Sequence, residues 1–176
     1  MEEGLTLLAE SGDNGFSLRE LARRVGVTAN ASYRHFANKE ALLQALASEG
    51  FRRLSAAQRD AEARAAPGDQ LLAAGRSYLR FAHQNPALFG LMFSVIPPQR
   101  SDDELGAASR ASFEALRQAV ARGWRGAEPE PARVTRAALR AWALVHGLSR
   151  LSLDGQLDWL EEDPLDFAQS VLADAV

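Results

Sequence analysis

The sequence predicts an all-α fold of about nine helices. Helix-favouring Ala, Leu, Arg, Glu and Gln dominate, and runs of β-branched residues are absent. No segment of useful length alternates apolar and polar residues as a half-buried strand would. Apolar residues instead recur every three or four positions, and clusters rich in Gly, Pro, Asn and Asp separate these periodic stretches.

The composition excludes several functional classes. The chain contains no cysteine, so it offers no disulfide, thiolate nucleophile or cysteine metal site. Its longest apolar stretch, Ala87–Ile96, is about half the length that a membrane-spanning helix needs. The chain opens with Met-Glu-Glu rather than with a basic signal-peptide region. We therefore expect a cytoplasmic protein.

The first two helices are predicted from their end signals. The first covers about Glu2–Glu10 and ends in the turn-forming cluster Ser11–Gly15. The second begins at Ser17, where Ser17 and Glu20 have the spacing of a capping box, and it ends at Gly26. Its predicted buried stripe has helical spacing: Leu18, Leu21, Ala22 and Val25.

Later helices are predicted in the same way. Thr28 caps a short helix over about Ala29–His35, and Asn38 caps a long one over about Lys39–Ala65. The apolar stripe of the long helix is Leu42, Leu43, Leu46, Ala47 and Leu54. Pro67-Gly68 is the clearest break in the chain. Further helices are expected at about Asp69–Gln84, Pro86–Phe93, Asp103–Arg122, Ala132–Leu153 and Pro164–Ala175.

The segment Ser17–Phe36 has the pattern of a helix-turn-helix, whose second helix enters the major groove of DNA. Ala22 is small enough for close helix packing, Gly26 permits the turn, and we expect Val27 and Phe36 to fill the core. Residues 17–39 carry five basic side chains against Glu20 alone, a local charge of +4 in a chain whose net charge is −3. By charge alone, a solvated helix face is the competing interpretation.

The stretch FSLRELARRVGVTANASYRHFANKEALLQAL, residues 16–46, resembles the DNA-binding domain of the TetR family of transcriptional regulators. The matching pattern is L-x-x-L-A-x-x-x-G-V followed by Y-R-H-F-x-x-K-E-x-L. The resemblance implies a DNA-binding head at residues 1–48. It also implies base or phosphate contacts from Thr28, Asn30 and Ser32, and phosphate contacts from Tyr33, Arg34, His35 and Lys39.

The segment AALRAWALVHGLSRLSLDGQL, Ala137–Leu157, resembles the C-terminal domain of a TetR branch named for Trp-His-Gly. This implies a ligand-binding and dimerisation domain at residues 49–176. We expect the helix of Trp142 and His146 to be apolar nearly all round, and Gly147 to permit close approach of another helix. Core packing is the competing interpretation for each proposed ligand-pocket residue: Tyr78, Phe81, Phe89, Met92, Phe93, Phe113, Trp142 and His146.

The sequence thus predicts a homodimeric, ligand-responsive regulator, a repressor that a small-molecule effector releases from a palindromic DNA operator. We expect no enzyme activity, cofactor, metal or membrane association, since the three histidines are far apart and no catalytic motif occurs. The alternative is a helical ligand-binding or interaction module that does not bind DNA. Glu2 and Glu3 favour that alternative, because they stand where basic residues would help DNA binding.

Overall fold

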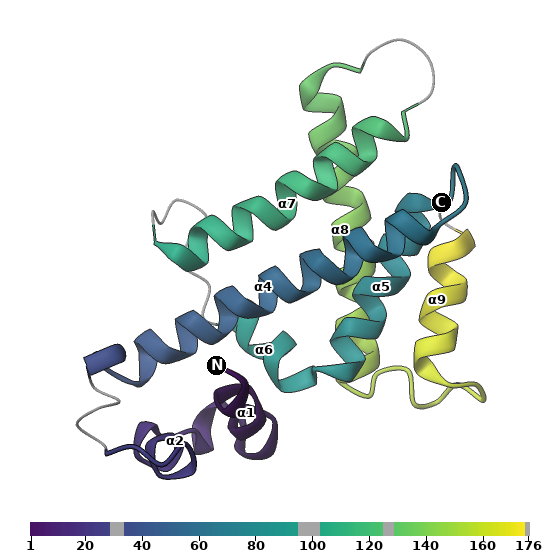
Figure 1. Cartoon of the computed structure of the whole chain (residues 1–176). Coiled ribbons are helices and arrows are strands. Elements are labelled where there is room, and N and C mark those ends of the chain that lie inside the picture. The colour runs from purple at the N-terminus through teal and green to yellow at the C-terminus, as the bar shows by residue number, and fades with distance from the viewer. Residues whose placement is uncertain (29–33, 95–102, 125–128, 175–176) are drawn as a thin grey trace. The chain divides into compact units, whose positions relative to one another are not determined.

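The computed structural model describes residues 1–28, 34–94, 103–124 and 129–174 (Figure 1). These residues form eight helices and no strand, which confirms the all-α prediction. No helix in the described ranges is long and apolar enough to cross a membrane.

The helix bounds agree with the sequence prediction to within one or two residues except in the first helix, which continues to Gly15. Gly12 interrupts that helix with a left-handed φ of 64°, at the predicted break. Of the predicted short third helix, only Arg34 and His35 are described, and both are helical. The helices are α1 (Glu2–Gly15), α2 (Leu18–Arg24), α4 (Lys39–Arg64), α5 (Gln70–Gln84), α6 (Pro86–Ser94), α7 (Glu104–Arg122), α8 (Pro131–Leu153) and α9 (Pro164–Asp174).

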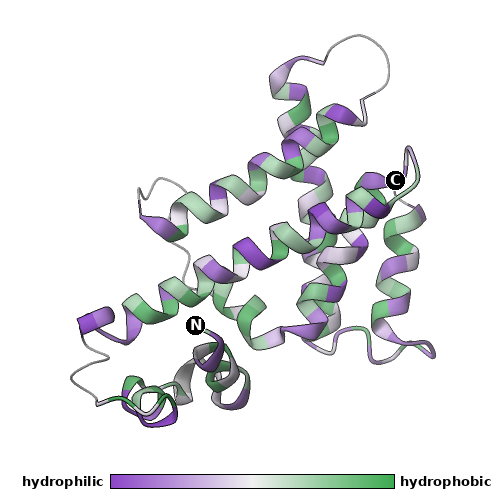
Figure 2. Ribbon diagram, viewed as in Figure 1, coloured by the Kyte–Doolittle hydropathy of each residue, from purple (hydrophilic) through white to green (hydrophobic). Residues whose placement is uncertain are grey.

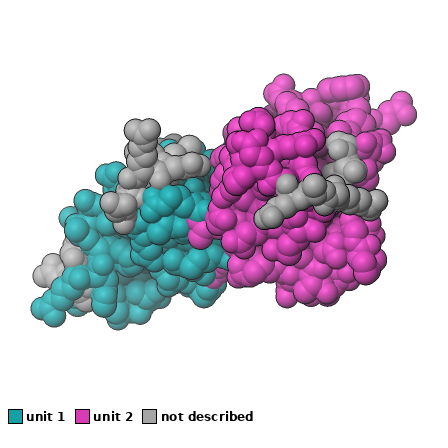
Figure 3. Space-filling view, turned by 90° about the horizontal axis from the view of Figure 1, so that it is seen from above, with its two compact units in different colours: residues 1–52, 85–110 teal, residues 53–84, 111–176 magenta. Residues whose placement is uncertain are grey.

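The chain divides into two compact units (Figure 3). Unit 1 comprises Met1–Arg52 and Asn85–Arg110, and unit 2 comprises Arg53–Gln84 and Ala111–Val176. In unit 1, α1 packs against α2 and α6. Its core combines the predicted stripes of α2 and α4 with α1 and α6, and its most buried side chains are Leu8, Leu42, Leu46, Phe89 and Met92.

Unit 2 is built on α5, α8 and α9, each of which packs against the other two. Gly75 of α5 lies directly beneath Leu172 of α9, so a side chain at that position would collide with the leucine. A second cluster joins α7 to α8 through Val120, Val134 and Ala138. Figure 2 shows the resulting alternation of apolar and polar residues along the helices of this unit.

Helix starts are capped by three acidic or amide side chains. Asn38 Oδ1 accepts the Ala41 N–H at 2.8 Å, as predicted, and Asp103 Oδ1 accepts the Gly106 N–H at 2.7 Å. Asp163 accepts two amide protons of the first turn of α9. Carboxylates at these positions also complement the positive end of the helix dipole.

The predicted capping box at the start of α2 is wrong. Ser17 is the N-cap residue, but its hydroxyl caps no backbone N–H. Glu20 points away from the cap and binds Arg23 and Arg24 instead. A charge-assisted hydrogen bond to a guanidinium is stronger than one to a neutral amide, which explains the preference.

The predicted burial of Val25 and Val27 is also wrong. The two side chains are 48% and 45% exposed. They border an apolar hollow of about 220 Å³ in unit 1, whose walls include Leu21 and Phe36. The turn after α2 therefore leaves apolar surface uncovered where the stripe was expected to continue into the core.

Helix α8 is not buried all round, contrary to the prediction. Val134, Ala138, Val145 and Leu148 are buried, but Leu139 is 52% exposed and Leu151 is 46% exposed. A Cβ built on Gly147 would meet nothing within 4 Å, so this glycine permits no close approach within the described chain. One face of α8 is thus open.

Gly50→Ala tests the packing of α4 on α6 in unit 1. The new Cβ would lie 2.6 Å from Met92 Sδ and 3.1 Å from Leu88 Cδ1, and both side chains are buried. We expect overpacking to lower the free energy of unfolding by about 1–3 kcal/mol, measured by urea denaturation. The matched control is Gly90→Ala in α6, where a Cβ meets nothing within 4 Å and helix propensity favours alanine. Equal stability of the two variants would contradict the packing.

Candidate DNA-binding head and aromatic core

A tight turn follows α2. Gly26 adopts a left-handed φ of 71°, which a residue with a Cβ rarely adopts. The Gly26 N–H donates to the Arg23 carbonyl at 3.3 Å, and the Val27 N–H donates to the Ala22 carbonyl at 3.0 Å. These two bonds satisfy helix-end carbonyls in the manner of a C-terminal glycine cap. The turn thus has the geometry that a helix-turn-helix requires.

Four of the seven predicted DNA-contacting residues are among the described residues, and they follow this turn in the chain. Thr28, Arg34 and His35 are exposed, and Lys39 is half-buried in the first turn of α4. Asn30, Ser32 and Tyr33 lie outside the described residues. The accessible position of the first three side chains is compatible with nucleic-acid contact, and their role stays a prediction.

Arg24 joins α1 to α2 inside the head. Its guanidinium hydrogen-bonds Glu10 of α1 and Glu20 of its own helix, and its Nη1 lies 3.6 Å from a Glu3 carboxylate oxygen. Arg23 adds a two-pronged bond to Glu20 at 2.6 and 2.9 Å. These contacts lower the pKa of Glu20 to about 2, chiefly through the hydrogen bonds from Arg23 and Arg24.

This network changes the interpretation of the basic patch. The local charge of +4 over residues 17–39 includes Arg23 and Arg24 as cations that could bind DNA. In the fold, both are neutralised by carboxylates, two of which (Glu3 and Glu10) lie outside that range. Arg19 and Arg34 are the other two arginines of this range. Sequence counting missed the pairing because Glu10 is 14 positions away from Arg24.

Five of the eight predicted pocket residues lie in unit 2, and four of them form a continuous row. Phe113 and Trp142 have ring centroids 5.8 Å apart, and Trp142 and His146 are 6.1 Å apart. The i, i+4 spacing had predicted that second contact. His146 in turn lies 6.4 Å from Tyr78. Phe81, the fifth residue, is buried on the same helix as Tyr78.

Hydrogen bonds fix the orientation of this row. The Trp142 indole N–H can only donate, and it binds the Tyr78 oxygen. The Tyr78 hydroxyl and His146 Nδ1 also share a hydrogen bond, at 2.9 Å. Burial together with nearby Arg150 keeps the pKa of His146 below the ordinary value. Burial also raises the pKa of Tyr78.

The other three predicted pocket residues lie in unit 1. Phe89 and Phe93 have ring centroids 5.0 Å apart, and Phe93 makes an edge contact of 5.5 Å with Phe51. Met92 packs beneath Gly50. Sequence reasoning missed Phe51, although it follows Ala47 at the helical spacing of the α4 stripe. Nothing within unit 1 distinguishes these residues from an ordinary core.

Comparison with known sequences gives two family matches. The family described as bacterial regulatory proteins, tetR family, matches residues 1–46. The tetracyclin repressor-like C-terminal domain matches residues 71–175. The curated HTH-type transcriptional regulator Rv1816 of Mycobacterium tuberculosis is 30% identical over 132 residues, which are 70% of this chain and 56% of that protein. The chain thus matches little more than half the length of this relative.

Comparison with solved structures gives the same fold. A protein of unknown function from Rhodococcus sp. RHA1 has a TM-score of 0.81 at 30% identity, covering 99% of this chain and 92% of its own. The transcriptional regulator FadR from Bacillus subtilis, in complex with stearoyl-CoA, has a TM-score of 0.71 at 16% identity, covering 98% and 93%. The second likeness concerns the fold alone.

The Arg24 network makes the head sensitive to acid. Because the pKa of Glu20 lies below its ordinary value of 4.5, its pairing stabilises the fold above pH 4.5, and this contribution is lost as the pH falls towards 2. We expect Arg24→Gln to lower the thermal midpoint at pH 7 and the difference from wild type to shrink between pH 4.5 and 2. Circular dichroism at stepped pH measures both.

Arg64→Gln is the control for this prediction. It removes an exposed ion pair with Asp60, in which both side chains are about 70% exposed. Exposed pairs of this kind contribute little to stability. An Arg24→Gln variant as stable as Arg64→Gln at pH 7 would show that the head does not depend on the network.

Tyr78→Phe tests the hydrogen-bonded row in unit 2. The change leaves the Trp142 N–H without its acceptor and His146 Nδ1 without its hydrogen-bond partner, so we expect a loss of about 1–3 kcal/mol in the free energy of unfolding. A double-mutant cycle with His146→Leu separates the energy of the Tyr78–His146 hydrogen bond from the stability losses of the two single variants. Additive losses would refute the Tyr78–His146 bond.

Proposed function

The chain belongs to the TetR family of bacterial regulatory proteins, and we propose that it is a transcriptional regulator that binds operator DNA. The observation that carries this proposal is the turn at Gly26, which follows α2 with a left-handed φ and precedes exposed Thr28, Arg34 and His35. It lies inside the stretch that matches the DNA-binding half of the family.

In this proposal the side chains divide into two groups. Tyr33, Arg34, His35 and Lys39 contact phosphates and fix the position of the head on the duplex, whereas Thr28, Asn30 and Ser32 approach base edges. Lys39 lies in the first turn of α4, so a phosphate there also meets the positive end of that helix. Arg23 and Arg24 have no part in this interface, since carboxylates of the head hold them.

We further propose that residues 1–48 act as the DNA-binding head and residues 49–176 as the effector-binding and dimerisation domain. The protein works as a homodimer on a palindromic site, because two recognition helices then enter successive major grooves. Binding of a small molecule lowers DNA affinity about 5–150-fold, the usual range of allosteric coupling, and so relieves repression.

The effector site in this proposal is the aromatic set of Tyr78, Phe81, Phe113, Trp142 and His146 in unit 2. The other three predicted pocket residues, Phe89, Met92 and Phe93, belong to unit 1. The row in unit 2 supports it, since it combines apolar rings with a few oriented polar groups, as ligand sites do. FadR, a protein of this fold, holds stearoyl-CoA. Acyl-coenzyme A thioesters are therefore the first compounds to test as effectors.

The function is tested by titrating the purified protein against the DNA upstream of its own gene at two salt concentrations, followed by fluorescence anisotropy. Selective binding that weakens steeply with salt, at two protomers per site, supports the regulator. Absence of selective binding under both conditions overturns it in favour of a module that does not bind DNA. The same titration repeated with acyl-coenzyme A present tests the effector class.

Tyr33→Ala and Arg34→Ala each remove one proposed phosphate contact. We expect each to weaken operator binding by about tenfold. Arg34→Ala should also lower the slope of log affinity against log salt by about one, whereas Tyr33→Ala, which removes no charge, should leave that slope nearly unchanged. Arg64→Ala is the matched control, because it deletes an exposed cation at the end of α4 outside the head. Wild-type affinity and salt slope in both head variants would exclude this surface as the DNA interface.

A further inference from the structure

The apolar hollow beside Val25 and Val27 combines a buried wall with an exposed one. It measures about 220 Å³, and its lining residues belong to unit 1. The buried wall consists of side chains that are at most 5% exposed: Leu18, Ala22 and Leu42. The exposed wall is formed by Val25 and Val27. This head hollow is therefore a depression that reaches the core of unit 1, and not a flat apolar patch.

The lining of the head hollow is apolar apart from Glu3 and His35. Among the described residues, no lysine or arginine lines it. The Glu3 carboxylate lies 3.6 Å from Arg24 Nη1, so its charge already has a cationic neighbour. His35 is exposed, and its ring can exchange a hydrogen bond with a polar group at the exposed wall. The hollow thus favours an uncharged compound that carries one polar group.

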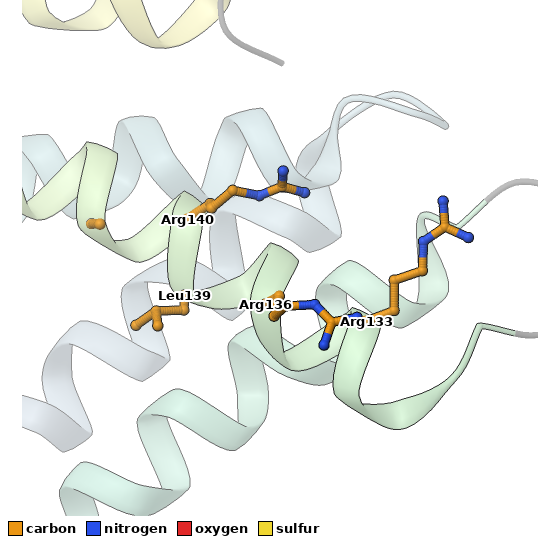
Figure 4. A pocket seen from close by; sticks show the side chains of 5 residues that line it. Arg133, Arg136, Leu139 and Arg140 are labelled. Carbon is orange, nitrogen blue, oxygen red and sulfur yellow. The ribbon is translucent and has the colours of Figure 1, made fainter.

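An arginine-rich hollow on α8 has the opposite character (Figure 4). It measures about 560 Å³, and its lining includes Arg133, Arg136 and Arg140. All of its lining side chains project from this one helix, so the depression is open. Guanidinium groups bind carboxylates and phosphates, so this lining favours anions. Ligand charge therefore distinguishes the two hollows, and an anionic analogue becomes an informative control for binding in the head.

The size of the head hollow limits its occupant to a small ring system. An apolar cavity of about 150 Å³ stays free of water and binds benzene. At about 220 Å³, the head hollow has room for one further ring or a short substituent. A buried water needs about two to four polar partners, and the side chains of the buried wall offer none. An aromatic compound of one or two rings therefore fits this space better than water does.

We propose that the head hollow binds a small uncharged aromatic compound, and that this compound raises the affinity of the head for operator DNA. The second part rests on the proposed function. The hollow is lined on both sides of the predicted recognition helix, because Val27 precedes that helix and His35 and Phe36 lie at its end. A bound ring contacts both sides at once, together with α2 and α4, which also line the hollow. Ordering this segment in advance lowers the cost of ordering it on DNA.

Binding is tested with 5-fluoroindole, an uncharged two-ring compound with one N–H group, followed by fluorine NMR on the full chain without DNA. We expect a dissociation constant of about 1 mM or below, which a ligand of about ten non-hydrogen atoms reaches at modest efficiency per atom. The anionic analogue 5-fluoroindole-2-carboxylate is the ligand control. We expect any binding of this analogue to be unaffected by substitutions in the head hollow.

Val25→Trp locates the site, because Val25 lies in the exposed wall and a larger ring there fills the hollow. We expect the dissociation constant of 5-fluoroindole to rise about tenfold or more. Leu151→Trp is the matched control, since Leu151 is 46% exposed but lies on α8 in unit 2, and we expect it to bind as the wild type does. Val27→Ser removes part of the apolar wall without filling the hollow, and we expect about fivefold weaker binding. Circular dichroism checks that each variant folds.

Two results would overturn the site. One is the absence of 5-fluoroindole binding to the wild-type chain at millimolar concentrations. The other is wild-type affinity in both Val25→Trp and Val27→Ser, which would place the compound elsewhere, as in the aromatic row of unit 2. Neither result bears on operator binding, because no DNA is present in this titration.

Fluorescence anisotropy of labelled DNA from upstream of the gene tests the coupling. We expect saturating 5-fluoroindole to raise the affinity about fivefold or more, the lower end of usual allosteric coupling. Val25→Trp should remove this response, and Leu151→Trp should retain it. An unchanged or lowered affinity in the wild type overturns the coupling and leaves the ligand site standing. A chain that binds no operator overturns the proposed function instead, and the fluorine NMR titration still decides whether the head hollow binds the compound.

Discussion

Each described helix buries apolar side chains against another helix, and the fold depends on that constraint. In unit 1, α1, α4 and α6 meet this requirement closely enough that Gly50 leaves no room for a methyl group beside Met92. In unit 2, Gly75 has the same relation to Leu172. Interiors packed to this density transmit displacements instead of absorbing them.

Apolar side chains remain exposed at two places. Val25 and Val27 expose apolar surface beside the turn of the head, and Leu139 and Leu151 do so along α8. Single exposed apolar residues are ordinary, and Leu139 differs from Leu151 in that it also lines the arginine-rich hollow of α8. In the head, carboxylates pair with Arg23 and Arg24, so these two arginines contribute to the stability of the head.

Much of the fold could be predicted from the sequence, because helix ends are local events. Pro, Gly and capping residues act within a few positions, so the bounds of α4 to α9 followed from them. The predicted capping box at Ser17 is wrong because Glu20 binds Arg23 and Arg24 of its own helix instead of the cap amide. Arg24 also binds Glu10 of α1, a contact that no local pattern indicates. The ring contact of Trp142 with His146 followed from spacing, whereas the approach of Tyr78 depends on how α5 packs on α8. Residues 29–33, which carry most of the proposed base contacts, lie outside the description.

Helix α8 connects the proposed effector site to the outward face of the same helix through its geometry. Successive residues of a helix diverge by about 100°, so Trp142 and His146 face the aromatic row while Ala143 and Gly147 face outward on the same two turns. A ligand that enters the row must separate the Tyr78 hydroxyl from His146 or move α8 away from α5. A displacement of α8 also moves the outward side chains of the same helix. Effector binding is therefore expected to alter the outward face of α8 along with the aromatic row.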